Sequence, residues 1–268
     1  MSALLRAVYD LAGELRGLGP AAHTLHDKGV SPPLRERLAA LLRDVHELEH
    51  DLASIRAPFL APQLRALGID ERSTELKVHI GCGGHELDGW INVDNHPAPL
   101  AINLDWGLPL PDRSARYVFL AHLLEHLFHP KQSGLLLAEI RRVLAPGGVV
   151  RIVVPDIAKY LRAYAREDDA FFADRRRHSR LPEDITNLES FLAYAGVGPD
   201  PEALFDQHKF GYDFATLSRS LERAGFVNVR RCAYQCSPHA VLRVDHASSN
   251  ASAKHGDEHC SLFVEAEG

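Results

Sequence analysis

The fold of this chain is decided by the stretch Lys77-Val78-His79-Ile80-Gly81-Cys82-Gly83-Gly84, which is followed by Trp90-Ile91-Asn92-Val93-Asp94. The apolar run before Gly81 predicts a β-strand. Glycines directly after a strand let the backbone turn sharply and approach a ligand closely, where a Cβ atom would collide. An acidic residue at the end of the next strand can accept hydrogen bonds from both hydroxyl groups of a ribose. Together these features suit a site for a nucleoside-containing cofactor.

From Leu76 onward, short apolar runs alternate with helical patterns. A helix is expected from about Gln132 to Leu144, where Ala145-Pro146-Gly147-Gly148 stops it. The β-branched run that follows is typical of a strand buried on both faces of a parallel sheet. The alternation predicts an α/β fold with a doubly wound, mainly parallel seven-stranded sheet. The expected strands are Leu76–Ile80, Trp90–Val93, Leu100–Leu104, Tyr117–Ala121, Val149–Val154, Phe226–Cys232 and Ser261–Ala266.

Two segments differ from this alternation. Residues 1–70 have helical periodicity and predict an N-terminal helical lid or oligomerisation segment, with a homodimer through these helices as the expected assembly. Residues 71–268 are predicted to form the cofactor-binding domain. Within it, residues 157–206 are rich in aromatic and charged side chains and predict a helical insertion after the fifth strand, over the substrate pocket.

The composition argues against several classes of protein. A formal charge of −6 and a pI near 6.2 do not suit a surface that follows nucleic-acid phosphates, so no nucleic-acid partner is expected. No signal pattern and no apolar run of membrane-spanning length is present, so no membrane partner is expected either. The 4 cysteines are too few and too scattered for a disulfide scaffold. A cytoplasmic location is therefore predicted.

Residues 76–155 resemble the class I S-adenosylmethionine-dependent methyltransferases, and in particular a bacterial branch that opens with the pattern GCG…GWxNVD. Several ordered blocks carry this resemblance: Asp105-Trp106, His122-Leu123-Leu124-Glu125-His126-Leu127, Arg142-Val143-Leu144-Ala145-Pro146-Gly147-Gly148 and Arg151-Ile152-Val153-Val154-Pro155-Asp156. The resemblance implies S-adenosylmethionine as the cofactor and methyl transfer as the reaction.

The resemblance also implies roles for individual positions. The methionine part of the cofactor would lie on Gly81, Cys82 and Gly83, and near His79, where the family usually has an acidic residue that helps to bind the methionine amine. Its ribose would be held by Asp94 and the neighbouring Asn95, and its adenine by Asp105 and Trp106. The transferring methyl group would be bordered by Ala121 and His122 at the end of the fourth strand.

A group of polar residues follows that strand. His122, Glu125, His126 and His129 have the spacing i, i+3, i+4 and i+7, which predicts one face of a helix. Three hypotheses stay open for this group. His122 and His126 can be catalytic, as bases that deprotonate the acceptor. Glu125 and His126 can bind a divalent metal ion, although no metal ligand is assigned. The group can also be purely structural.

A second candidate segment is Gln207-His208-Lys209-Phe210-Gly211-Tyr212-Asp213, which precedes an expected helix at Asp213–Gly225. In the sequences that this chain resembles, it often faces the substrate pocket. His208 and Tyr212 are therefore further candidates for substrate contact or proton transfer. The alternative is that Tyr212 packs in the core and that Asp213 is an N-cap.

The dinucleotide-binding dehydrogenases are excluded because the distance from Gly81 to Asp94 is too short for their fingerprint. Two alternatives to methyl transfer remain at this point. One is an enzyme that uses S-adenosylmethionine for cyclisation or amino-acid-chain transfer, and the other is a non-catalytic partner subunit. For a methyltransferase, the expected acceptor is an oxygen or nitrogen of a small metabolite, a glycan or a natural-product intermediate.

Overall fold

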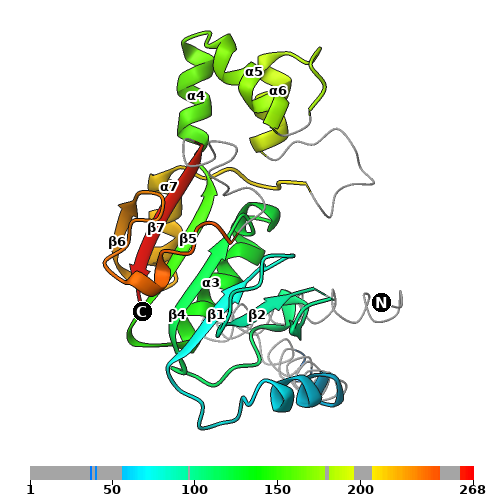
Figure 1. Cartoon of the computed structure of the whole chain (residues 1–268), viewed down its shortest axis with the longest axis vertical. Helices are drawn as coiled ribbons and strands as arrows, with labels where there is room; N and C mark the ends of the chain where they lie inside the picture. Colours follow the sequence, from blue (N-terminus) through cyan, green and yellow to red (C-terminus); the bar gives the residue numbers. More distant parts are fainter. Residues whose placement is uncertain are drawn as a thin grey trace.

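A computed structural model describes residues 37, 40, 56–95, 97–178, 181–195, 207–247 and 260–268. In these residues one sheet has the strand order β3-β2-β1-β4-β5-β7-β6 (Figure 1). Strands β1 to β5 are parallel, whereas β7 is antiparallel to both β5 and β6. The mainly parallel seven-stranded α/β sheet predicted from the sequence is confirmed. Its strands are β1 (Leu76–Ile80), β2 (Ile91–Asp94), β3 (Leu100–Ala101), β4 (Ala115–Ala121), β5 (Leu144–Pro155), β6 (Val227–Cys232) and β7 (Ser261–Glu267).

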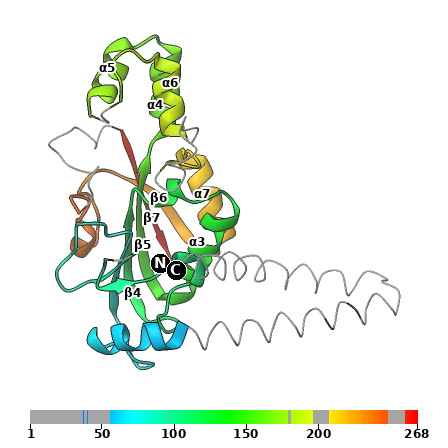
Figure 2. The same ribbon diagram turned by 90° about the vertical axis from the view of Figure 1, so that its right-hand side faces the viewer.

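The two faces of the sheet bury different side chains because neighbouring residues of a strand point to opposite sides. Val78 and Ile80 of β1 pack in the larger core cluster, on the face that carries helices α3 (Lys131–Val143) and α7 (Phe214–Arg223). Figure 2 shows these two helices on one side of the sheet. Asp213 accepts a hydrogen bond from the Thr216 backbone amide at 2.8 Å, so it is the N-cap of α7.

The other face is covered by loops in the described part of the chain. Only residues 81–90 join β1 to β2, which is too short for a packed helix, and residues 233–247 form the other loop. Phe119 and Phe263 lie in the smaller core cluster beneath these loops. One buried side chain, Arg151 of β5, holds the second loop.

Arg151 is fully buried, and so are both of its acidic partners. Its guanidinium contacts Asp245 at 2.6 and 2.8 Å and Glu265 of β7 at 2.8 Å. It also donates to the backbone carbonyls of Ala233 and Cys236. A buried charge that is paired and fully hydrogen-bonded in this way avoids most of the cost of its desolvation. These bonds fasten the loop at 233–247 to the sheet.

Three helices follow β5 and project beyond the carboxyl ends of the parallel strands (Figures 1 and 2). They are α4 (Ile157–Ala165), α5 (Asp169–His178) and α6 (Asn187–Ala195). Tyr160, Phe172 and Cys260 form the buried centre of a separate small cluster there, with Phe171 and Tyr194 packed against it. Most of the aromatic side chains of the insertion therefore pack on one another.

Two predicted strand boundaries differ from the structure by more than two residues. The segment Ala145-Pro146-Gly147-Gly148 lies inside β5, where the pairing with β4 has a register shift between Ala115 and Tyr117. A Cβ atom at Gly148 would lie 2.9 Å from the Ala145 carbonyl oxygen, so the strand passes there only because this residue is glycine. The strand predicted at Leu100–Leu104 is limited to Leu100–Ala101.

The predicted helices of residues 1–55 and the homodimer through them lie outside the described residues, apart from Arg37 and Ala40. Residues 56–66 are helical and pack against β3, where the Gln63 side chain accepts a hydrogen bond from the Ala101 amide at 2.7 Å. Within the described ranges, no helix combines the length and the apolarity needed to cross a bilayer. The cytoplasmic location stays a prediction.

Candidate active site

The glycine turn after β1 is built around the carboxylate of Asp94. The Gly83 amide donates to one Asp94 oxygen at 2.7 Å, and the Asn95 amide donates to the other at 2.6 Å. Gly81 and Gly83 have φ angles of 74° and 51°, in the left-handed region that favours glycine. The predicted residues of the turn and the end of β2 therefore lie together.

The turn has the shape that a nucleoside cofactor requires. A Cβ atom at Gly83 or at Gly84 would have no neighbour within 4 Å, so the backbone there faces open space. Each Asp94 oxygen uses one lone pair on a backbone amide and keeps another for a ribose hydroxyl. The residues present thus fit S-adenosylmethionine at its ribose. The Cys82 side chain is buried, and its backbone amide donates to the Val93 carbonyl at 3.2 Å.

His79 does not fit the predicted direct contact with the cofactor, because its side chain is fully buried. Its ring lies against Phe119, with 5.1 Å between centroids, and its Nδ1 is 3.2 Å from the Asn92 side-chain oxygen. Asn92 in turn hydrogen-bonds both the amide and the carbonyl of Leu87. Burial lowers the pKa of His79 to about 4, so the ring is neutral at pH 7. His79 therefore positions the loop after the glycine turn.

Asp105 and Trp106 lie in a short 3-10 helix, η1 (Leu104–Trp106), that follows β3. Asp105 accepts a hydrogen bond from the Gln132 amide group at 3.3 Å. The Trp106 ring lies under the Arg56 guanidinium, 5.4 Å away, and edge-on to Phe59. Their position after a parallel strand is consistent with an adenine contact, which stays a prediction.

His122 follows Ala121, the last residue of β4, and lies between two side chains. Its Nδ1 is 3.1 Å from Glu125 Oε1, and its Nε2 is 3.2 Å from the Ser261 hydroxyl at the start of β7. Its φ of 51° is rare for a residue with a Cβ atom, and such strain often occurs at functional sites. Burial alone would raise the pKa of the Glu125 carboxyl group. The hydrogen bond from His122 and the charge of its ring together have a larger, opposite effect, so the pKa of Glu125 lies below its ordinary value. Glu125 is therefore an ionised partner for His122.

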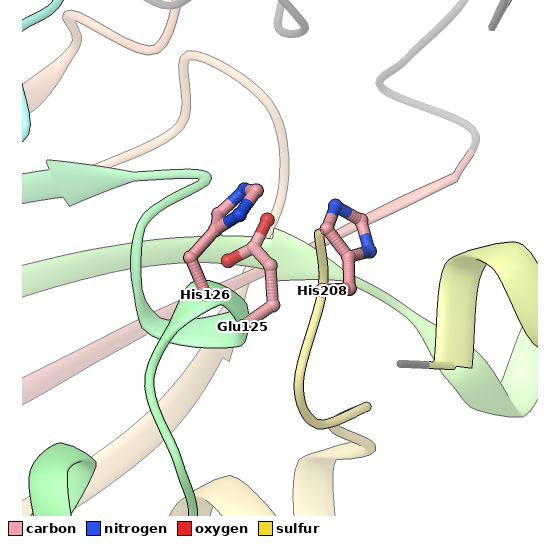
Figure 3. A group of neighbouring side chains, drawn as sticks. All are labelled: Glu125, His126 and His208. Carbon is pink, nitrogen blue, oxygen red and sulfur yellow. The ribbon is translucent and has the colours of Figure 1, made fainter. Parts of the chain in front are cut away.

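His126 and His208 lie beside the same carboxylate (Figure 3). Their ring centroids are 4.8 Å apart and the rings are perpendicular. His208 is held by Tyr194, whose backbone carbonyl is 2.9 Å from its Nδ1. The amide of Lys209 donates to the Glu125 carbonyl at 2.7 Å, and its ammonium donates to the His126 carbonyl at 2.8 Å. The segment before α7 is thus fixed onto the loop after β4.

The helix predicted for His122 to His129 is wrong. Only η2 (Leu124–His126), a short 3-10 helix, is present, because Leu127 is extended with φ −106° and ψ 141°. The ring of His129 consequently leaves the group and stacks on Phe210, with 4.1 Å between centroids. His122, Glu125 and His126 still meet, through a tight turn.

Tyr212 lies in the core and not at the surface of a pocket. Its side chain is fully buried in the larger core cluster, and its ring packs edge-on against Phe210 and His129. Burial raises its pKa to about 12. In the structure Tyr212 therefore has a packing role, and its predicted role in catalysis stays a prediction.

A cleft of about 410 Å³ opens next to Ser261 at the carboxyl end of β5. Polar side chains in its wall include Asp156, Lys159 and Arg231, with Arg231 3.8 Å from Asp156. No functional role was predicted from the sequence for these three residues or for Ser261. Asp156 could have been found as an acidic residue at the end of a buried strand, whereas Ser261 comes from a part of the chain that carries no motif.

Comparison with known proteins found one matching family and several similar solved structures. The methyltransferase domain family matches residues 94–152. Similar solved structures include an S-adenosylmethionine-dependent methyltransferase from Archaeoglobus fulgidus, which has 17% sequence identity, covers 80% of this chain and 94% of its own, and has a TM-score of 0.40. Another, from Mesorhizobium loti, has 17% identity, covers 77% of this chain and 96% of its own, and has a TM-score of 0.39. A third, from Methanosarcina mazei, has 16% identity, covers 73% of this chain and 93% of that one, and has a TM-score of 0.42. None of the curated protein sequences matches the chain.

The TM-scores to these structures are below 0.5, so the assignment depends on the topology, the site and the family match. A parallel sheet with an antiparallel β7 and a glycine turn closed on an acidic strand end define the class I methyltransferase fold. The protein is an S-adenosylmethionine-dependent methyltransferase, and S-adenosylmethionine is its cofactor.

Proposed function

We propose that this methyltransferase methylates an oxygen or nitrogen of a small acceptor (a small metabolite, glycan or natural-product intermediate), with His122 as the general base. One observation carries the proposal: His122 is held between the buried carboxylate of Glu125 and the Ser261 hydroxyl, which lines the cleft.

The two neighbours of His122 define what its ring can do. In the neutral ring of His122, an Nδ1–H that donates to Glu125 Oε1 leaves Nε2 without a proton, so Nε2 can accept one. Nε2 faces Ser261, on the side of the cleft. An acceptor hydroxyl or amine in the cleft could give its proton to Nε2, and the carboxylate would stabilise the imidazolium that forms.

S-adenosylmethionine, when bound, supplies a methyl group that its sulfonium already activates. Gly83 and Asp94 would hold its nucleoside part. The role of the other residues is to align the acceptor with this methyl group and to exclude water. No covalent intermediate on the protein is needed.

The charges around the cleft support a narrower proposal for the acceptor. Lys159 and Arg231 bring two positive charges to its wall, and Asp156 brings one negative charge. Guanidinium and ammonium groups bind carboxylates and phosphates well. An acceptor with an acidic group, such as a uronic acid or a sugar phosphate, is favoured within the proposed range.

The test compares His122→Gln with a matched control, His129→Gln, whose ring lies outside the network. Methyl transfer from radiolabelled S-adenosylmethionine would be measured on uronic acids, sugar phosphates and phenols, with S-adenosylhomocysteine as the second product. Loss of a general base costs roughly 10²- to 10⁴-fold in kcat. His122→Gln should lose this much while its Kd for S-adenosylhomocysteine stays within twofold of the wild type. A His122→Gln enzyme with unchanged kcat would exclude the base, and methylthioadenosine as the product would exclude methyl transfer.

A second test concerns the cofactor. Asp94→Ala should weaken the binding of S-adenosylhomocysteine, measured by calorimetry, by roughly 10- to 100-fold, because hydrogen bonds to a charged group contribute about 1.5–3 kcal/mol. Asp88→Ala, in the same loop and exposed, is its control. Equal affinities of the two variants would exclude Asp94 as a ribose ligand.

A further inference from the structure

Two histidines that the proposed reaction does not use lie beside its base. One side-chain atom from each of Glu125, His126 and His208 lies within 4.8 Å of one from each of the others. Figure 3 shows the three side chains converging, with Glu125 and His126 from the turn after β4 and His208 from the segment before α7. Two imidazoles and one carboxylate are a common ligand set for divalent transition metals.

Backbone contacts prepare both imidazoles as ligands. The Tyr194 carbonyl lies 2.9 Å from His208 Nδ1, so the proton of a neutral ring resides there and Nε2 keeps its lone pair. His126 is hydrogen-bonded to the backbone of Gln207. A metal-binding histidine typically donates its second ring nitrogen to a carbonyl or carboxylate, which orients the ring and fixes its tautomer.

The carboxylate offers one oxygen that lacks a partner. Glu125 is buried, with 1% of its surface exposed. Its Oε1 contacts His122, whereas its Oε2 has no hydrogen-bond partner among the described residues. A buried polar atom of this kind is uncommon, because losing its water without a new partner is costly. A cation would be such a partner.

We infer that Glu125, His126 and His208 bind one divalent metal ion of the zinc type. Zinc bonds of 2.0–2.2 Å in a tetrahedral site place the ligand atoms about 3.3 Å apart. Atoms within 4.8 Å of one another would have to approach by up to about 1.5 Å to reach that spacing, and His126 and His208 are both only partly buried. Three protein ligands leave the fourth position open, as in catalytic zinc sites. Magnesium, which prefers oxygen ligands, fits this set poorly.

The position of the ion suggests its role, and this part depends on the proposed function. Glu125 would share its two oxygens between His122 and the metal. An acceptor hydroxyl at the open position would become more acidic and pass its proton to His122. Its oxygen would then form the new bond to the methyl carbon, and the carbon–sulfur bond would break with its electron pair going to sulfur. The ion also offsets the charge of Glu125, and the Lys209 ammonium lies on the His126 carbonyl at 2.8 Å, which together favour an anionic acceptor.

The test measures binding before activity. Chelator-treated full-length protein would be titrated with Zn²⁺ by calorimetry and with Co²⁺ by visible absorption. We expect one ion per chain and the intense d–d bands of a four-coordinate Co²⁺ site. His208→Ala and His126→Ala should weaken binding at least 100-fold, whereas His246→Ala, an exposed histidine of the loop at 233–247, should leave it within twofold.

A second measurement needs no variant. X-ray absorption of the zinc-loaded wild type should show nitrogen and oxygen ligands near 2.0–2.1 Å with imidazole scattering. A sulfur shell near 2.3 Å, unchanged affinity in both histidine variants, or no stoichiometric binding by the wild type would each overturn the site. If zinc binds with these ligands but chelation leaves methyl transfer unchanged, the site stands and its catalytic role fails. Loss of activity in His122→Gln with metal still bound tests the proposed function separately.

Discussion

Because His79 of β1 is buried, we expect the stability of the protein to depend on pH in a measurable way. His79 has no exposed surface, and burial lowers its pKa from 6.5 to about 4, with the Asn92 hydrogen bond and the Asp94 charge opposing this shift. The unfolded chain therefore binds the His79 proton near pH 6.5, and the folded protein binds it only near pH 4. Between these values the unfolded state carries more protons, so the free energy of unfolding falls as the pH drops.

The magnitude follows from the two pKa values. At pH 7 the His79 ring is mainly neutral in both the folded and the unfolded state. Its burial therefore lowers the free energy of unfolding very little at this pH. At pH 5 the unfolded ring is nearly fully protonated, whereas the folded ring is not. Integration between these limits gives a loss of about 2 kcal/mol from pH 7 to pH 5. The loss would be complete only below pH 4.

The measurement is urea denaturation of the wild type and of His79→Gln at pH 7, 6 and 5. A glutamine amide can still donate to Asn92 but does not titrate. The wild type should lose about 2 kcal/mol more than His79→Gln between pH 7 and pH 5. His246→Gln, an exposed control, should retain the wild-type pH dependence. Equal losses in the wild type and His79→Gln would refute the burial argument.

Three further outcomes follow from the packing. Arg151→Met should lower the free energy of unfolding by about 3–5 kcal/mol at pH 7 in urea, because it leaves Asp245 and Glu265 buried without their cation; a loss below 1 kcal/mol would contradict this. Asp213→Ala should cost about 1 kcal/mol in the same assay through the lost N-cap of α7, and an unchanged midpoint would exclude the cap. Tyr212→Phe should leave kcat/KM within twofold, and a tenfold decrease would return Tyr212 to the active site.

The sheet could be predicted from the sequence because its strands are short apolar runs that end at glycines or at acidic residues. The loops that cover the other face of the sheet, opposite α3 and α7, could not be predicted. Arg151 and Glu265 stand in β5 and β7 among apolar residues, and no pattern says that they pair with Asp245 across the sheet. A doubly wound fold normally covers both faces with helices. In the described residues, an ion-paired loop takes that place beside the short β1–β2 connection.

In the active site, too, one part could be predicted from the sequence and another could not. The turn from Gly81 to Gly84 and Asp94 lie close together in the sequence, and their arrangement was predicted. His122, Glu125 and His126 were predicted to meet on one face of a helix, and that helix is absent from the structure. They still meet, because a tight turn also brings residues i, i+3 and i+4 together. His208 and Ser261 come from far along the chain, and only the folded structure places them against Glu125 and His122.

One carboxylate connects these distant parts. The side chain of Glu125 contacts His122, and its backbone carbonyl receives the amides of Lys209 and Phe210. The segment that follows the helical insertion is thus tied to the residue that orients the base.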